Sequence, residues 1–148
     1  MRTLRDLVHK QEMRYVNKGE TVLEAVNYMS EHKIGAVPVL EGDRLVGIFS
    51  ERDLMVRCVA GRLDIEKTKI DDVMTKRVII MEAGDTYEEC LRIMKQEGIR
   101  HVPVCDSDKL VGVVSMRDIM QADVEEKEQK IDILHSYIHY NPKGKNKE

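Results

Sequence analysis

A serine and an aspartate three residues apart occur twice in this chain in nearly the same setting. Ser50 and Asp53 lie in the segment GIFSERDL, and Ser115 and Asp118 lie in GVVSMRDI. An apolar run precedes each serine, so we expect the serine to end a strand and begin a helix. The free N–H groups of a helix start attract an anion such as phosphate. An aspartate one turn further on could accept hydrogen bonds from the two hydroxyl groups of a ribose.

The same spacing is also that of an ordinary helix cap. A capping serine accepts a hydrogen bond from a backbone N–H, and the acid is favoured by the positive end of the helix dipole. The two roles are compatible, and the repetition favours binding, because both copies follow Leu-Val-Gly and both carry an arginine before the aspartate. These arginines, Arg52 and Arg117, could assist a phosphate or be solvated helix residues, and the sequence favours neither role.

These motifs belong to a longer internal repeat. A shift of 65 residues places 19–55 on 84–120 without a gap, and 16 of the 37 aligned positions are identical. Such self-similarity predicts two copies of one structural unit.

Each unit predicts the same order of elements. Thr21 with Glu24, and Thr86 with Glu89, have the spacing of a capping box and precede an apolar helical face. Two β-like runs separated by turn residues follow, and the second helix begins at the serine. Short strands at 13–16 and 77–80 complete a β-α-β-β-α unit. We expect a mixed α/β (α+β) fold in which the two units pack sheet to sheet about a pseudo-twofold axis.

The predicted boundaries are 3–60 for the first repeat, 61–69 for a polar connector, 70–122 for the second repeat, 123–140 for an extra C-terminal helix and 141–148 for a disordered tail. The C-terminal helix carries a thin apolar stripe formed by Val124, Ile131, Leu134 and Ile138. This stripe could pack on its own domain or on a symmetry mate, and we favour the dimer contact.

Composition narrows the class of protein. The 148 residues are 42% apolar and 34% charged with a net charge of −3, so no basic surface for nucleic acid is expected. No apolar run approaches a membrane span, and the first residues do not form a signal-peptide core, so a cytoplasmic location is expected. Three cysteines without metal spacing predict buried thiols in a reducing compartment. His135 and His139 are four residues apart, but we interpret them as surface residues and expect no metal site.

The doubled pattern of a Pro-Val strand, Leu-Val-Gly and Ser-x-x-Asp, with Asp-Val-Met-Thr at 72–75, resembles a tandem pair of CBS (cystathionine β-synthase) domains, a Bateman module. The resemblance covers about residues 3–122. It implies a regulatory module without catalysis that binds an adenosine-containing molecule between the repeats. The implied ligands are AMP, ADP or ATP, with NAD or S-adenosylmethionine also possible, and no cofactor is required. It further implies a homodimer and a regulated partner protein.

The resemblance also assigns residues to two clefts. It implies that basic residues just before one repeat's proline face the phosphates of the nucleotide whose ribose the other repeat's aspartate binds. Arg100 and His101 would therefore share a cleft with Ser50 and Asp53. The reciprocal cleft of Ser115 and Asp118 would face Gly35 and Ala36 and lack such a cation. We therefore expect the Asp53 cleft to be the better nucleotide site.

Two further groups complete the predicted site. Thr75, at the end of the Asp-Val-Met-Thr segment, resembles a threonine that lines the pocket in this family. Gly35, Ala36 and Val37 lead into a proline-containing strand that can offer adenine an apolar slot and backbone partners. The leading hypothesis is thus a nucleotide-sensing regulatory module. The alternative is a ligand-free dimeric scaffold whose C-terminal helix recruits a partner, and no residue set predicts an enzyme.

Overall fold

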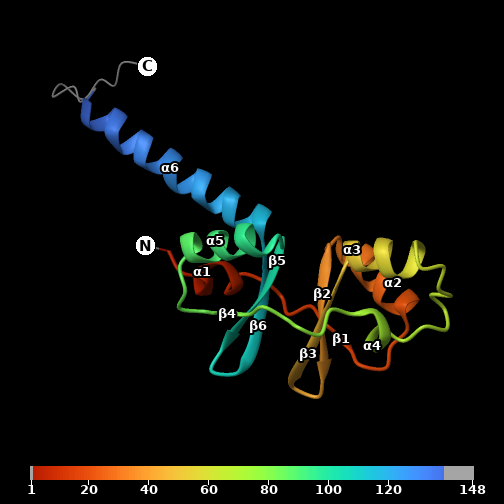
Figure 1. Ribbon diagram of the computed structural model, residues 1–148. Helices are drawn as coiled ribbons and strands as arrows, with labels where there is room; N and C mark the ends of the chain where they lie inside the picture. The colour runs from red at the N-terminus through yellow and green to blue at the C-terminus, as the bar shows by residue number, and fades with distance from the viewer. Residues whose placement is uncertain (1, 139–148) are drawn as a thin grey trace.

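The computed structural model describes residues 2–138, which form two similar halves (Figure 1). The first half contains β1 (Val16–Asn17), α2 (Val22–His32), β2 (Ala36–Glu41), β3 (Arg44–Ser50), α3 (Glu51–Asp53) and the π-helix η1 (Leu54–Val59). The second half contains β4 (Met81–Glu82), α5 (Tyr87–Glu97), β5 (His101–Asp106), β6 (Lys109–Ser115) and α6 (Met116–Ile138). Short helices, α1 (Leu4–Val8) and α4 (Ile70–Val73), precede the two series. The β-α-β-β-α order predicted from the repeat is confirmed.

The helices α2 and α5 each begin at the capping threonine that the sequence predicts. The Thr21 hydroxyl accepts a hydrogen bond from the Glu24 backbone N–H at the start of α2, at 3.2 Å. At the start of α5 the box is reciprocal, because the Glu89 carboxylate also accepts from the Thr86 backbone N–H, at 3.0 Å. Capping of this kind supplies partners for N–H groups that a helix start leaves unpaired.

Each half has a three-stranded sheet in the order β1-β2-β3 or β4-β5-β6. The first pair of strands in each sheet is parallel and the second pair is an antiparallel hairpin. The opening strands are shorter and later than the predicted ranges 13–16 and 77–80, because parallel pairing begins only at Val16 and Met81, where side chains enter the core. The sheets lie side by side at the centre, with most helices on the outer flanks (Figure 1).

The short helices α1 and α4 each pack on the opposite half. Leu4 and Val8 of α1 belong to the core of the second half, and the Leu4 N–H donates to the Asp85 carbonyl at 2.9 Å. Ile70 of α4 belongs to the core of the first half, and its N–H donates to the Glu20 carbonyl at 2.8 Å. The chain therefore crosses between the halves after each short helix.

The C-terminal prediction was wrong in one respect. We expected a helix from Ser115 and a separate one over 123–140, but α6 runs without a break from Met116 to Ile138. No glycine or proline occurs in this range, and Ala122 is buried, so nothing interrupts the helix. The outer part of α6 projects away from the body (Figure 1). Residues 139–140, including His139, and the predicted tail 141–148 lie outside the described residues.

The three cysteines are free and buried, as predicted. In the described part of the chain no helix is long and apolar enough to cross a membrane. No group of three potential metal ligands occurs among residues 2–138.

Candidate functional site

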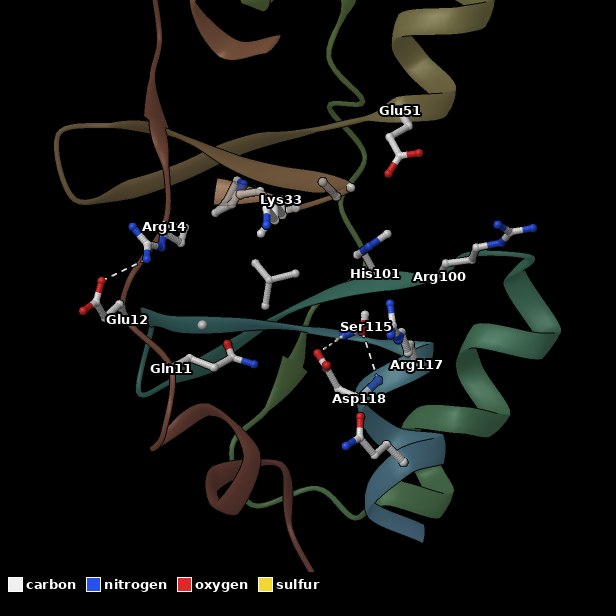
Figure 2. A pocket seen from close by; sticks show the side chains of 17 residues that line it. Gln11, Glu12, Arg14, Lys33, Glu51, Arg100, His101, Ser115, Arg117 and Asp118 are labelled. Atoms are coloured by element: carbon white, nitrogen blue, oxygen red, sulfur yellow. Dashed lines mark hydrogen bonds and ion pairs between the residues drawn. The ribbon is translucent and has the colours of Figure 1, made fainter. Parts of the chain in front are cut away.

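A cavity of about 780 Å³ lies between the two halves (Figure 2). Its lining comes from the end of α2 and the start of β2 in the first half, and from β5, β6 and the start of α6 in the second. The segment 11–14, which crosses from α1 to β1, also contributes. This volume is in the range of small-molecule sites in proteins.

Ser115 and Asp118 lie in this cavity at the beginning of α6. The Asp118 N–H donates to the Ser115 hydroxyl oxygen at 3.0 Å, and the Ser115 N–H donates to Oδ2 of Asp118 at 3.1 Å. The predicted cap is therefore present. Among the described residues, no other group donates a hydrogen bond to the Asp118 carboxylate, which leaves acceptor positions for a ligand.

Asp53 occupies the equivalent place in the first half but has a different environment. It is only 8% exposed, and its carboxylate accepts hydrogen bonds from the Ser50 backbone N–H at 3.0 Å and from the Thr75 hydroxyl at 3.1 Å. Nε of Arg57 lies 3.7 Å from Oδ1 of Asp53. Arg57 also donates to the Val73 and Met74 carbonyls. Hydrogen bonds and an ion pair within the protein thus already engage the oxygens of the Asp53 carboxylate.

The difference between the two aspartates has a cause in the sequence. The position 65 residues after Arg57 is Ala122, which is buried and cannot form an ion pair. The residue equivalent to Thr75 in the first repeat is His9, because Asp-Val-Met-Thr at 72–75 aligns with Asp-Leu-Val-His at 6–9, and His9 is exposed and does not line the Asp118 cavity. The two partners that enclose Asp53 are therefore absent from the corresponding positions around Asp118.

The expected distribution of cations was wrong. We expected the cleft of Ser115 and Asp118 to lack a cation, with Arg100 and His101 facing Asp53, but both residues line the Asp118 cavity. The hairpin register explains this, because His101 pairs with Ser115 across β5 and β6. The Met116 N–H also donates to the Arg100 carbonyl at 2.8 Å. The basic pair is thereby held beside the helix start of its own repeat.

The remaining predicted residues divide between the cavity and other places. Gly35 and Ala36 line the Asp118 cavity, as expected, and Arg117 does as well. The Val37 side chain is fully buried in the core of the first half, because alternate residues of a strand point to opposite faces. Arg52 is exposed and does not line this cavity.

Four cationic side chains line the cavity: Arg14, Lys33, Arg100 and Arg117. Arg14 forms an ion pair with Glu12 at 3.0 Å. The other three have no ion-pair partner within 4.0 Å in the part of the chain that the structure describes. Apolar lining is provided by Ile34, Ala36, Pro38 and Val113. The cavity thus combines an apolar surface with groups that attract an anion.

His101 lies among charged groups at the centre of this site. Burial lowers its pKa from the ordinary 6.5, whereas Glu51 and Asp118 act in the opposite direction. A Cβ atom added to Gly35 would lie 3.2 Å from Cε1 of His101 and would overlap the Glu51 carboxylate. Glycine at position 35 therefore allows His101 and Glu51 to approach the same strand end.

Sequence reasoning missed several cavity residues: Gln11, Glu12, Arg14, Lys33, Glu51 and Gln121. Residues 11–14 enter the site only because α1 packs on the second half, which no local pattern indicates. Lys33 could have been noticed in the sequence, because the repeat aligns it with Gly98 and the two copies therefore differ at this helix end.

Comparison with known proteins gives a consistent result. The CBS domain family matches residues 4–59 and 70–125. The chain is 32% identical over 120 residues to Hypoxic response protein 1 of Mycobacterium tuberculosis, covering 80% of this chain and 83% of that protein.

Solved structures agree with the sequence comparison. A CBS-domain-containing protein of Agrobacterium tumefaciens is 31% identical with a TM-score of 0.76, covering 82% of this chain and 99% of that one. A CBS domain protein of Pyrobaculum aerophilum, complexed with AMP, is 26% identical with a TM-score of 0.69. That likeness covers 79% of this chain and 89% of the other.

Proposed function

This chain belongs to the CBS-domain family, and from that premise we propose that it is a regulatory module that binds an adenine nucleotide in the Asp118 cavity. The observation that carries the proposal is the partly exposed carboxylate of Asp118 at a helix start, in a cavity that also holds Arg100 and Arg117. CBS-domain proteins are typically regulatory and non-catalytic, and we propose the same for this chain.

The parts of a nucleotide match different parts of the cavity. Asp118 can accept hydrogen bonds from the ribose hydroxyls, because its carboxylate has acceptor positions left over from capping. Phosphate would lie near the start of α6, where Ser115 is flanked by Arg100 and Arg117. The apolar side chains Ile34, Pro38 and Val113 offer a surface for adenine.

The related protein of Pyrobaculum aerophilum is complexed with AMP, which supports an adenosine ligand for this chain. AMP, ADP and ATP are the ligands that we propose first, and NAD and S-adenosylmethionine complete the set to be tested. Asp53 is the weaker candidate of the two aspartates, because Thr75 and Arg57 already engage its carboxylate. This reverses the preference drawn from the sequence.

The proposed mechanism is a population shift. Both halves line the cavity, so a ligand that contacts both stabilises the packing in which its contacts are best formed. A coupling free energy of about 1–3 kcal/mol would be enough for regulation of a partner protein. The identity of that partner and a cytoplasmic location stay predictions.

We also propose that the module forms a homodimer. Met55 and Val59 of η1 and their counterparts 65 residues later, Met120 and Val124 of α6, are all more than half exposed. Because the two halves repeat this apolar surface, a second copy related by a twofold axis can match both at once. Ile131 and Leu134 extend the apolar surface along α6.

Nucleotide binding can be tested by thermal shift and isothermal titration calorimetry with AMP, ADP, ATP, NAD and S-adenosylmethionine. At least one of them should raise the Tm by mass action. Asp118→Asn should weaken binding by about tenfold or more, since asparagine lacks the charge. The unliganded protein should keep nearly the same Tm, because the amide oxygen of asparagine can still accept the hydrogen bond from the Ser115 N–H.

The control is Asp132→Asn, an exposed acid on α6 outside the cavity, which should bind as the wild type does. The nucleotide proposal fails if none of these ligands binds, or if Asp118→Asn binds them with unchanged affinity.

The homodimer is tested by sedimentation equilibrium. Met120→Glu should shift the protein to monomer, because it puts a charge in an apolar contact, whereas Gln129→Glu, at an exposed position on the same helix, should leave the dimer intact. A wild-type protein that is monomeric at high micromolar concentration would refute this surface as a dimer contact.

A further inference from the structure

Lys33 has an unusual backbone conformation at the end of α2. Its φ is 54° and its ψ is 45°, in the left-handed region, and its N–H donates to the carbonyls of Met29 and Ser30. The aligned residue at the end of α5 is Gly98, with φ 66° and ψ 33°, and its N–H donates to the Met94 carbonyl. The two helices thus end in the same way, one with glycine and one with lysine.

Glycine adopts this conformation without cost, whereas any residue with a Cβ is strained there. The second half shows that glycine serves this helix end well. A lysine at this strained position indicates that its side chain has a use, since strained backbone residues cluster at ligand sites.

The Lys33 side chain lines the Asp118 cavity. In Figure 2, Lys33 lies between Arg14 on one side and Arg100 and Arg117 on the other. Glu12 offsets the charge of Arg14 through their ion pair at 3.0 Å. Lys33, unlike Arg14, therefore lines the cavity without an ion-pair partner among residues 2–138.

A nucleoside monophosphate carries a single phosphate for these cations. That phosphate, at the start of α6 beside Arg100 and Arg117, would leave Lys33 without an anion of its own. A ligand with a second phosphate could contact Lys33 in addition to Arg100 and Arg117, and the cavity of about 780 Å³ has room for it.

We propose that Lys33 is a specificity residue that binds a second phosphate, so that the cavity selects adenine ligands with two or more phosphates over AMP. This inference rests on the proposed function of the cavity. The shared chemistry is a polyphosphate, which a phosphate chain (ADP, ATP) or a dinucleotide (NAD) can supply.

Calorimetric titration at fixed ionic strength with AMP, ADP, ATP and NAD tests the inference. The wild type should bind at least one of the last three about tenfold more tightly than AMP. In Lys33→Gly and Lys33→Asn that preference should fall to within about twofold, while the affinity for AMP stays nearly unchanged. Comparison of ADP and ATP with NAD distinguishes a phosphate chain from a dinucleotide.

Folding does not obscure this test, because Lys33→Gly introduces the residue that the second half already has at this position. Its Tm should equal or exceed that of the wild type. The matched control is Lys95→Asn, an exposed lysine in the last turn of α5 outside the cavity, which should keep the wild-type preference.

The outcomes separate the two proposals. If AMP binds through Asp118 as tightly as ADP, ATP and NAD do, the inference is overturned while the nucleotide site stands. If Lys33→Gly raises the Tm but keeps the wild-type preference, Lys33 only ends the helix and the inference is again overturned. If the wild type binds none of the four, both proposals fail.

Discussion

The Thr75 hydroxyl donates a hydrogen bond to the Asp53 carboxylate across 3.1 Å, with Oδ1 as the acceptor. Thr75 follows α4, and backbone bonds with Ile48 hold it against β3, at 2.8 and 2.9 Å. Asp53 is the buried charged residue of the described part of the chain. The bond therefore attaches the segment that leaves the first half to the helix start where the sequence predicted a ligand.

Thr75→Val should destabilise the fold, because it removes a donor from a buried carboxylate while keeping the shape of the side chain. We expect the free energy of unfolding to fall by about 1–2 kcal/mol. Urea denaturation measures this, and the slope m should stay constant. Thr75→Ser keeps the hydroxyl and should recover most of the loss. Equal stability of the valine variant and the wild type would show that the bond contributes nothing.

Gly47→Ala should destabilise the protein by about 1–3 kcal/mol through overpacking. The added Cβ would lie 2.8 Å from Cγ of Met74 and 3.0 Å from its Cε, and Met74 is only 5% exposed. Gly84→Ala is the matched control, since nothing lies within 4 Å of its added Cβ. Thermal unfolding of both variants provides the comparison. Equal Tm values would contradict close packing of Met74 against β3.

Stability should fall as the pH drops below the ordinary histidine pKa of 6.5, partly because of His101. Burial lowers the pKa of His101 in the folded protein, so the unfolded state binds more protons between the two pKa values. The free energy of unfolding therefore rises with pH through that window. His101→Gln should reduce this pH dependence, measured by urea denaturation between pH 5 and about 8.

The control for this experiment is His9→Gln, an exposed histidine that does not line the cavity, and it should keep the wild-type pH dependence. The charged groups around His101 are Glu51, Asp118 and Arg100, and all three remain in the variant. A His101→Gln variant that keeps the full wild-type pH dependence would exclude His101 as its source.

The cysteines should be unreactive in the folded protein. Burial raises the pKa of Cys90 to about 11 and also raises the pKa values of Cys58 and Cys105. At pH about 8 a thiol with that pKa is ionised in about one molecule in a thousand, and the thiolate is the reactive form. Ellman's reagent should therefore detect almost no thiol in buffer and all three in denaturant. Rapid labelling of the native protein would contradict their burial.

Much of the fold could be predicted from local patterns in the sequence. The repeat could be found by alignment of the chain with itself, and the helix starts at Thr86 and Ser115 depend on residues only three positions apart. The hairpins depend on short turns between apolar runs. The position of His101 beside Ser115 was also accessible in principle, because a hairpin's turn sets which residues pair.

The sequence by itself determined the duplicated unit, its order of elements and the serine and aspartate at each late helix, since these rest on interactions between near neighbours. Only the tertiary structure decided that α1 and α4 pack on the opposite halves, and hence that residues 11–14 reach one aspartate and Thr75 the other. The physical reason is that packing of distant segments is governed by complementary apolar surfaces, which leave no periodic mark in the chain. Two nearly identical motifs thereby acquired different surroundings, one closed by Thr75 and Arg57 and one open to a cavity.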